Sequence, residues 1–225
     1  CVMSTAQLVS SPLQFPDPTP FTNCRLCGSR LDSPPLVDFG LAALPTFPLP
    51  MEPVFRTPLS LTICPACSLA QLTHSVDRDL LYRTYFYESG TSDSMRQHLK
   101  ALAEEATTVT RLPQRGAVLD IGSNDGTLLR AIGSILGFSG PKFGFEPCQK
   151  FTPDGLVIAP TYFSRKAVEQ CKLPEQYDLI TSIAMFYDLD DPVPFCLDIG
   201  SLLSEKGVWC LEMNYLPLML RDGAF

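Results

Sequence analysis

The stretch VLDIGSNDGTLL, residues 118–129, decides the fold of this chain. It begins with a short apolar run, passes through a turn from Gly122 to Gly126, and continues into residues that favour a helix. A strand that ends in a glycine turn and opens a helix is the first part of a βαβ unit, and such turns usually hold a ligand. The nature of that ligand is the first question that the sequence raises.

Downstream of Gly116, apolar segments alternate with helical ones. Strands are predicted there at 117–122, 142–147, 156–160, 177–185 and 208–213, and helices at 126–136, 164–172 and 191–207. A further helix is predicted before Gly116, at 94–112, so the helix at 191–207 is the fourth along the chain. The last helix is expected to start at Asp191 and Pro192 and to end at Gly207. This alternation predicts an α/β fold, a Rossmann-like parallel sheet of about five strands wound on both faces.

The turn lacks the features that hold phosphate groups. A dinucleotide fingerprint reads G-x-G-x-x-G, and here Asn124 replaces the middle glycine that would admit a pyrophosphate. No G-K-[ST] follows, so a nucleoside-triphosphate loop is excluded. The carboxylates of Asp120 and Asp125 would also repel phosphates.

The same acidic groups suit a ligand with positive charge and free hydroxyls, and S-adenosylmethionine has both. Glu146 follows the second strand, where a carboxylate can accept hydrogen bonds from ribose hydroxyls. Backbone N–H groups from Asn124 to Gly126 can face the carboxylate of the ligand. Taken singly, the turn could be a helix cap and Glu146 a solvated acid; together they favour S-adenosylmethionine.

Two CxxC pairs form a second candidate site: Cys24 with Cys27, and Cys64 with Cys67. Four thiolates bind Zn²⁺ in a tetrahedron, each pair supplying two ligands through a tight knuckle. The alternatives are unrelated pairs or redox motifs, but a redox CxxC normally opens a helix in a βαβ unit, and these surroundings are rich in proline. We expect a structural zinc, since four thiolates leave no position open for catalysis.

Composition narrows the class of protein. The formal net charge of −7 argues against a broad nucleic-acid surface, so we expect no nucleic-acid partner. No apolar run reaches the length that spans a membrane, so no membrane partner is expected either. Nine cysteines, an odd number, fit a reducing cytoplasm better than a secreted disulfide scaffold.

Shifts in composition divide the chain into four segments. Residues 1–22 are expected to be a flexible lead-in, 23–80 a zinc-binding domain, 81–115 an aromatic linker with a helix, and 116–225 a Rossmann-like domain for S-adenosylmethionine.

With both sites in view, the chain resembles the S-adenosylmethionine-dependent sugar C-methyltransferases, which begin with a zinc-binding domain and methylate nucleotide-linked keto-deoxysugars. The shared motifs, in order, are CRLCGS, LSLTICPACSLAQLTHSV, YFYESGTSDSM, VLDIGSNDGTLL, GFEP, SIAMFYDLDDP and GVWCLEMNYLPLML. The resemblance implies a small-molecule, nucleotide-sugar substrate; the sequence leaves the oligomeric state open.

The resemblance also implies the roles of particular residues. The metal ligands would be Cys24, Cys27, Cys64 and Cys67, and the cofactor loop with its flanking acids would be Asp120, Gly122, Ser123, Asn124, Asp125, Gly126, Glu146 and Pro147. The adenine and methyl end would be lined by Ala184, Met185 and Phe186, and covered by Tyr85, Tyr87 and Ser89. Weaker candidates are Tyr187 and Asp188 for catalysis, then Glu212 and Asn214, whereas His74 and His98 are expected to be structural.

The family pattern continues into a His-Glu segment that supplies the proposed base and into a C-terminal domain. Both would lie beyond Phe225, so we expect a C-terminally truncated chain without the last two strands of the fold. Carbon methylation beside a ketone requires a base and a donor to the enolate oxygen. A ring face of Tyr85 or Tyr87 could lie against the sulfonium, or these rings could simply pack in the linker.

Two other functions remain open at this point. A nucleic-acid methyltransferase with a zinc ribbon would have a basic surface and an Asn/Asp-Pro-Pro-aromatic motif after the fourth strand, where this chain has IAMFYDL. A zinc-bearing interaction module without catalysis would leave the cofactor loop without a ligand.

Overall fold

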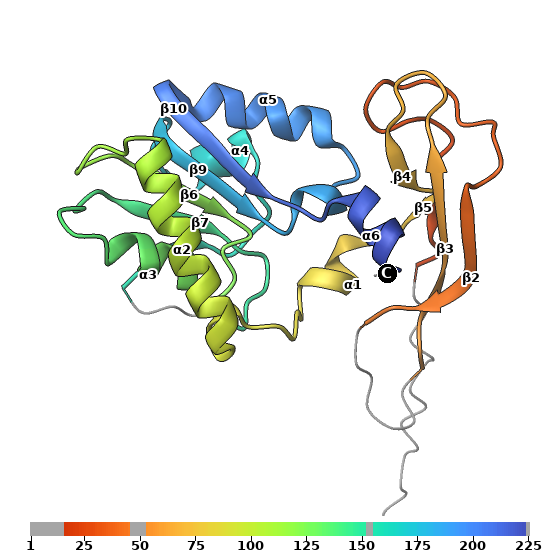
Figure 1. Cartoon of the computed structure of the whole chain (residues 1–225), viewed down its shortest axis with the longest axis horizontal. Coiled ribbons are helices and arrows are strands. Elements are labelled where there is room, and N and C mark those ends of the chain that lie inside the picture. Colours follow the sequence, from red (N-terminus) through yellow and green to blue (C-terminus); the bar gives the residue numbers. More distant parts are fainter. Residues whose placement is uncertain (1–15, 46–52, 152–154, 224–225) are drawn as a thin grey trace, which may run out of the picture.

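The chain folds into two parts joined by a short helical connection (Figure 1). The computed structural model describes residues 16–45, 53–151 and 155–223. Within these ranges, the residues up to Ser75 build a small antiparallel module, and those from Asp93 onward build a parallel sheet with its covering helices.

The larger part is a five-stranded parallel sheet in the order β10-β9-β6-β7-β8. Its strands are β6 (Val118–Ile121), β7 (Lys142–Phe145), β8 (Val157–Ala159), β9 (Tyr177–Ile183) and β10 (Leu203–Glu212). β6 lies at the centre, between β7 and β9. This confirms the predicted Rossmann-like sheet, and its switch point, where such sheets bind ligands, lies at the carboxyl end of β6.

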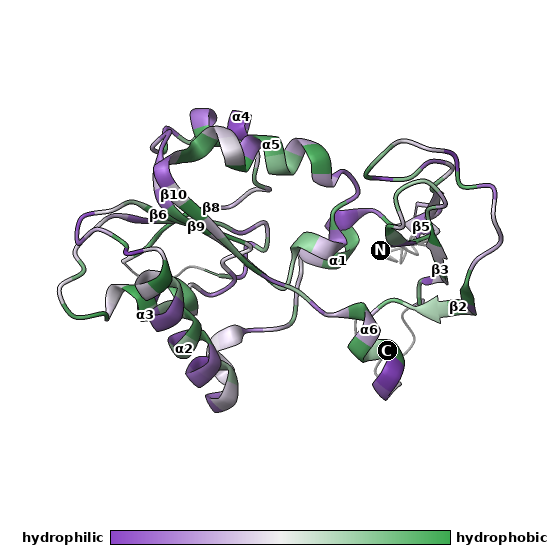
Figure 2. Cartoon of the chain, turned by 45° about the horizontal axis from the view of Figure 1, so that its top comes forward, coloured by the Kyte–Doolittle hydropathy of each residue, from purple (hydrophilic) through white to green (hydrophobic). Residues whose placement is uncertain are grey.

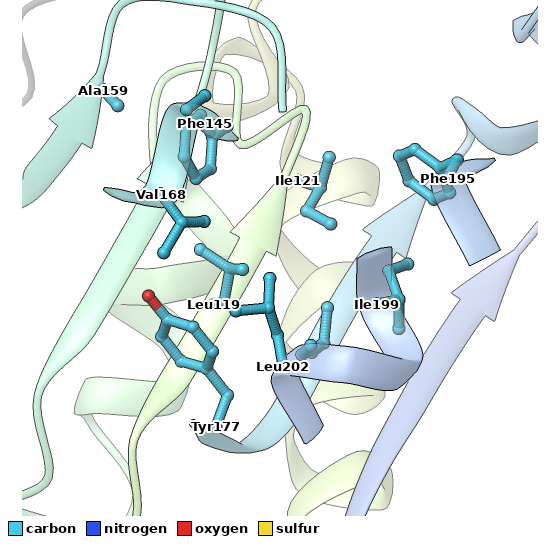
Figure 3. Close-up of a cluster of buried hydrophobic side chains, with 11 residues drawn as sticks. Leu119, Ile121, Phe145, Ala159, Val168, Tyr177, Phe195, Ile199 and Leu202 are labelled. Atoms are coloured by element: carbon cyan, nitrogen blue, oxygen red, sulfur yellow. The ribbon is translucent and has the colours of Figure 1, made fainter. Parts of the chain in front are cut away.

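Helices cover both faces of this sheet. α2 (Asp93–Val109) and α3 (Thr127–Gly133) pack on one face, and α4 (Arg165–Gln170) and α5 (Pro192–Leu202) on the other (Figure 1). Neighbouring residues of β6 serve opposite faces: Val118 packs toward α2 and α3, while Leu119 packs with Val168 and Leu202 of α4 and α5 (Figure 3). In Figure 2 the middle of the sheet is coloured mainly as hydrophobic, as expected where helices cover both faces.

Local signals set where the helices begin. The Ser92 hydroxyl accepts the N–H of Met95 at 3.5 Å at the start of α2, and the Ser164 hydroxyl accepts the N–H of Ala167 at 3.0 Å at the start of α4. Pro192 is the first residue of α5, where a missing N–H leaves no hydrogen bond unmade. These elements therefore start within a residue or two of the positions that the sequence predicts.

The predicted end of the fourth helix is wrong. α5 stops at Leu202 rather than at Gly207, because Leu203 pairs with Tyr177 and already belongs to β10. The register then shifts before Val208, and Gly207 lies inside this irregularity. A Cβ on Gly207 would lie 2.5 Å from the carbonyl oxygen of Tyr177. The glycine therefore lets the backbones of β10 and β9 pack closely, and it does not cap a helix.

The small module contains two antiparallel sheets. One has the order β2 (Val37–Ala43), β3 (Arg56–Ile63), β4 (Ala70–Leu72), and in the other β1 (Thr19–Pro20) pairs with β5 (His74–Ser75). β1 lies inside the predicted lead-in of residues 1–22, so that segment contributes to the module from residue 19 onward. Residues 1–15 of the lead-in lie outside the described residues.

Short elements complete the chain. α1 (Arg78–Tyr82) and α6 (Leu216–Asp222) lie between the parallel sheet and the small module (Figure 1). Two 3₁₀ turns, η1 (Ser89–Thr91) and η2 (Phe186–Asp188), follow the connection and β9 respectively. Among the described residues, no helix combines the length and apolar character needed to cross a membrane.

Candidate functional site

The four cysteines of the CxxC pairs come together in the small module. Their Sγ atoms all lie within 4.8 Å of one another, with Cys24 and Cys67, and Cys27 and Cys64, each 3.6 Å apart. A tetrahedron of Zn–S bonds of about 2.3 Å has edges of about 3.8 Å. The donor set and its spacing therefore fit a four-thiolate Zn²⁺ site.

Both halves of this cluster are knuckles of the same shape. The N–H of Gly28 donates to the carbonyl of Cys24 at 2.9 Å, and the N–H of Ser68 donates to the carbonyl of Cys64 at 2.9 Å. Gly28 and Ser68 both have positive φ angles, 73° and 63°. The repeated turn points each pair of thiols toward the other, as a shared metal requires.

The turn after β6 is tightly folded against β7. The N–H groups of Gly122 and Ser123 both donate to the carbonyl of Phe145, at 2.9 and 3.0 Å. Gly122 and Gly126 have φ angles of 75° and 81°, and Asn124, with φ 51°, shares this left-handed conformation. The conformation brings the loop to the carboxyl end of β7, where Glu146 lies.

Glu146 is bonded directly to this loop. Its Oε2 accepts the N–H of Asn124 at 2.8 Å, and its Oε1 accepts the N–H of Cys148 at 2.8 Å, across the bend at Pro147. Burial raises the pKa of Glu146, and the two N–H groups oppose that rise. The structure thus brings together the turn and the acid that the sequence assigns to one ligand.

Most of the loop amides already have acceptors inside the protein. The N–H of Asn124 goes to Glu146, that of Gly126 goes to the Ser123 carbonyl, and that of Thr127 goes to the Asp125 carboxylate. These amides are therefore not free to receive the carboxylate of a ligand. Among the described residues, only the Asp125 N–H of this turn is left without an acceptor.

Asp120 lies beneath the loop at the end of β6. It is buried, and its Oδ1 accepts the Thr181 hydroxyl of β9 at 2.7 Å. Burial raises the pKa of Asp120 to about 7, the hydrogen bond from Thr181 opposes this, and the charge of Glu146 adds to it. Asp120 therefore links β6 to β9 from within the protein.

The aromatic segment before α2 covers the loop. The N–H of Ser89 donates to Asn124 Oδ1 at 2.9 Å, and Asn124 Nδ2 donates to the Tyr87 carbonyl at 3.0 Å. The Cys148 thiol lies 3.7 Å from the carbonyl of Tyr85. Tyr87 and Ser89 are thus fixed beside the turn, and Tyr85 beside Cys148. That this segment covers a cofactor stays a prediction.

The residues after β9 divide between the site and the core. Ala184 is exposed with φ 54°, and the Met185 side chain lies 3.4 Å from the Cβ position of Gly122. Phe186 instead packs against Phe195 and Trp209, with ring centroids 5.8 and 5.3 Å away. The sequence assigns Phe186 to the adenine end of the site, but in the structure the ring joins the core.

Tyr187 and Asp188 lie at the carboxyl edge among other acidic and phenolic groups. Desolvation raises the pKa of Tyr187, and the charges of Asp188, Tyr85 and Glu212 raise it further. Asp188 is exposed as a residue, yet desolvation of its carboxylate raises its pKa, while Tyr82 and Arg25 oppose the rise. The edge therefore carries concentrated negative charge, which favours a cationic ligand and disfavours phosphate.

Two contacts at this edge are missed by sequence reasoning. His98 Nε2 of α2 lies 2.8 Å from Glu212 Oε2 at the end of β10, so His98 is next to the candidate site. The Ala184 N–H donates to the Glu212 carbonyl at 2.8 Å. Neither contact can be recognised from a local sequence pattern, because both join elements that are far apart along the chain. Asn214, the other weak candidate, is exposed and follows the end of β10.

A cavity of about 550 Å³ opens on the outer side of Asp125, between α2 and α3. Its lining includes Arg96, Lys100 and Arg130. Its lining does not include Glu146 or Tyr187.

Comparison with known proteins gives one curated relative. No family model matches the chain. Over 216 residues the chain is 25% identical to the C-methyltransferase NovU of Streptomyces niveus, a match that covers 92% of this chain and 50% of that protein. The chain therefore spans about half the length of this relative.

Solved structures with a similar fold are methyltransferases. The plantazolicin methyltransferase BpumL in complex with SAH matches with a TM-score of 0.43 and 16% identity, over 56% of this chain and 48% of that one. A putative sarcosine dimethylglycine methyltransferase from Galdieria sulphuraria matches with a TM-score of 0.42 and 18% identity, over 58% and 52%.

Proposed function

We propose that this chain carries the cofactor-binding part of an S-adenosylmethionine-dependent methyltransferase. The observation that carries the proposal is the Glu146 carboxylate, bonded to the Asn124 amide of the Gly122–Gly126 turn at the carboxyl ends of β6 and β7. The name of the relative NovU, a C-methyltransferase, supports the same reading.

The hydrogen bonding of the Glu146 carboxylate leaves it able to bind a ribose. Each carboxylate oxygen accepts one backbone N–H and keeps acceptor capacity for a further donor. Two neighbouring hydroxyls of an unphosphorylated ribose supply such donors. Bound there, S-adenosylmethionine would supply an electrophilic methyl group on a sulfonium, and the acidic edge near Tyr187 would favour that positive charge.

For the substrate, we propose a nucleotide-linked keto-deoxysugar or a similar small keto compound, methylated on carbon. Support comes from the order of motifs and from the relative's name. Tyr187 and Asp188 are the candidates to hold or move a proton near the reacting carbon, since they follow β9 at the carboxyl edge. Burial raises the pKa of both groups, so each holds its proton more strongly than a free side chain, which suits a hydrogen-bond donor to the enolate oxygen.

For the small module, we propose a structural Zn²⁺ on the four cysteines. A module with so little core gains folding free energy from a metal. As part of this proposal we keep the division into a lead-in, a zinc-binding domain, a linker (81–115) and a Rossmann-like domain (116–225), but we move the start of the zinc-binding domain from residue 23 to residue 19, where β1 begins. The free thiols fit a reducing cytoplasm. The net charge of −7 fits a small-molecule partner rather than a nucleic acid or a membrane.

Calorimetric titration with S-adenosylhomocysteine tests the proposal, with ADP as a matched adenine ligand that carries phosphates. We expect one binding site per chain for S-adenosylhomocysteine and at least about tenfold weaker binding of ADP, which the acidic edge repels. Glu146→Gln should weaken binding at least about tenfold, because a hydrogen bond to a charged group contributes about 1.5–3 kcal/mol.

Glu169→Gln is the matched control, since Glu169 is an exposed acid on α4 whose partner is Arg165. It should bind like the parent chain. A folded chain that gives no heat with millimolar S-adenosylhomocysteine would reject the methyltransferase proposal and leave a zinc-bearing interaction module as the better description.

A further inference from the structure

The segment of residues 186–190 joins β9 to α5 and carries both candidate catalytic residues, Tyr187 and Asp188. Its own hydrogen bonds are few: the N–H of Asp188 donates to the Met185 carbonyl at 3.1 Å, and that of Leu189 to the Phe186 carbonyl at 3.4 Å. Such a short 3₁₀ turn does not hold a fixed position by itself. Its position at the carboxyl edge must depend on contacts with other elements.

Several of those contacts come from the small module, far away in sequence. Arg25 Nη1 donates to the Leu189 carbonyl at 2.6 Å. The Ser75 hydroxyl of β5 donates to the Asp190 carboxylate. In the connecting helix α1, Tyr82 lies close enough to Asp188 to lower the pKa of that carboxylate. The segment is therefore held from the side of the cysteine cluster.

Arg25 lies inside the first knuckle, between Cys24 and Cys27. Its backbone N–H donates to Gln71 Oε1 at 3.0 Å, and Gln71 is only 2% exposed. Its guanidinium also lies 5.3 Å from the centre of the Phe21 ring. The direction of the Arg25 side chain is thus fixed by the shape of the knuckle, which the four thiolates would hold around a metal.

Placing the charged guanidinium of Arg25 at this junction costs desolvation free energy. It is partly buried, and its Nε has no hydrogen-bond partner among the described residues. The groups whose charges act on it are Asp190, then Asp188, then the neighbouring Cys24. Removing Arg25 would leave these carboxylates without their cation, so the arrangement of residues 186–190 should change.

We propose that Arg25 is a positioning residue that couples the metal-bound state of the four-cysteine site to the placement of residues 186–190, and so to ligand affinity at the carboxyl edge. This inference rests on the proposed function for its ligand and on the proposed zinc for its metal. It gives the small module a role in the reaction beyond its own stability.

The chain contains a single tryptophan, which reports on this segment directly. Trp209 lies 5.3 Å, centroid to centroid, from Phe186 at the start of the segment. The experiment compares Arg25→Gln with Arg30→Gln, a control in the same module whose partner is Asp32 and whose side chain is 79% exposed. Each variant is measured for zinc content, Trp209 emission and affinity for S-adenosylhomocysteine, before and after removal of the metal by a chelator.

We expect Arg25→Gln to retain one zinc per chain, to shift Trp209 emission, and to bind S-adenosylhomocysteine 5–150-fold more weakly, the usual range for coupled sites. Chelation should produce the same changes in the parent chain and in Arg30→Gln. In Arg25→Gln it should add little, because the coupling is already lost. Arg25→Lys should restore part of the affinity, since lysine keeps the charge but not the planar fork.

The inference is overturned if Arg25→Gln keeps its zinc and matches Arg30→Gln in emission and affinity, or if chelation affects both variants equally. If Arg25→Gln does not fold, Asp190→Asn disturbs the same junction from the opposite side and must shift Trp209 emission to support the inference. If the parent chain binds no S-adenosylhomocysteine, the proposed function fails, and Trp209 emission alone decides the coupling.

Discussion

Asp120 is a buried acid whose charge state should control stability. Burial raises its pKa to about 7 in the folded chain, against an ordinary value of 3.8. Between these two pH values the folded state binds more protons than the unfolded state, so the free energy of unfolding falls as the pH rises through this window. The gap between the two pKa values sets an upper limit of about 4 kcal/mol on this loss.

Asp120→Asn should remove this pH dependence, because an amide can still accept the Thr181 hydroxyl but cannot ionise. Thermal unfolding at pH 4.5 and pH 8 checks it: relative to the parent chain, the variant should gain stability at the higher pH. Asp32→Asn, which changes an exposed acid, is the control: its difference in stability from the parent chain should be the same at both pH values. If the difference in stability between Asp120→Asn and the parent chain is the same at pH 4.5 and pH 8, the proposed role of Asp120 is contradicted.

At the scale of single residues, the sequence predicts the location of the site better than its internal bonding. Glu146 can be placed beside the turn because parallel strands bring their carboxyl ends to one edge. The hydrogen bond that uses the Asn124 amide, and the turn of Phe186 into the core, depend on side-chain geometry that no local pattern encodes. The contact of His98 with Glu212 joins α2 to β10, so it is visible only in the folded chain.

At the scale of elements, two glycines in neighbouring elements differ in whether a larger residue could replace them. Gly207 lies in the irregular part of β10, where an added Cβ would meet the Tyr177 carbonyl oxygen at 2.5 Å and the Ser204 nitrogen at 2.8 Å. Gly200 lies on the exposed side of α5, with nothing within 4 Å of its Cβ position. The helical pattern of residues 191–207 hides this difference, because a glycine after a helix is also a normal helix end.

The two alanine variants form a matched pair. Gly207→Ala should lower the free energy of unfolding by about 1–3 kcal/mol, through overpacking against the backbone. Gly200→Ala should leave it unchanged or raise it by up to about 1 kcal/mol, because alanine is the better helix former. Denaturant unfolding measures both. Equal effects of the two substitutions would mean that β10 does not begin where the structure places it.

At the scale of the whole molecule, the small module and the parallel sheet are connected by polar contacts at the carboxyl edge. Arg25 reaches Leu189, Ser75 reaches Asp190, and Tyr162 donates to Asp79 of α1 at 2.8 Å. The sequence predicts both parts, since each has its own motif. It does not predict their relative placement, because the residues that join them have no pattern of their own.

The central claim is that the Glu146 carboxylate accepts hydrogen bonds from the ribose of a sulfonium nucleoside. A crystal structure of the chain with S-adenosylhomocysteine and zinc tests it most directly. The account predicts that both ribose hydroxyls lie within about 3.2 Å of the Glu146 carboxylate, the limit for a hydrogen bond, with the sulfur toward Tyr187 and Asp188. Ligand bound elsewhere, such as the cavity between α2 and α3, or a ribose turned away from Glu146, would contradict it.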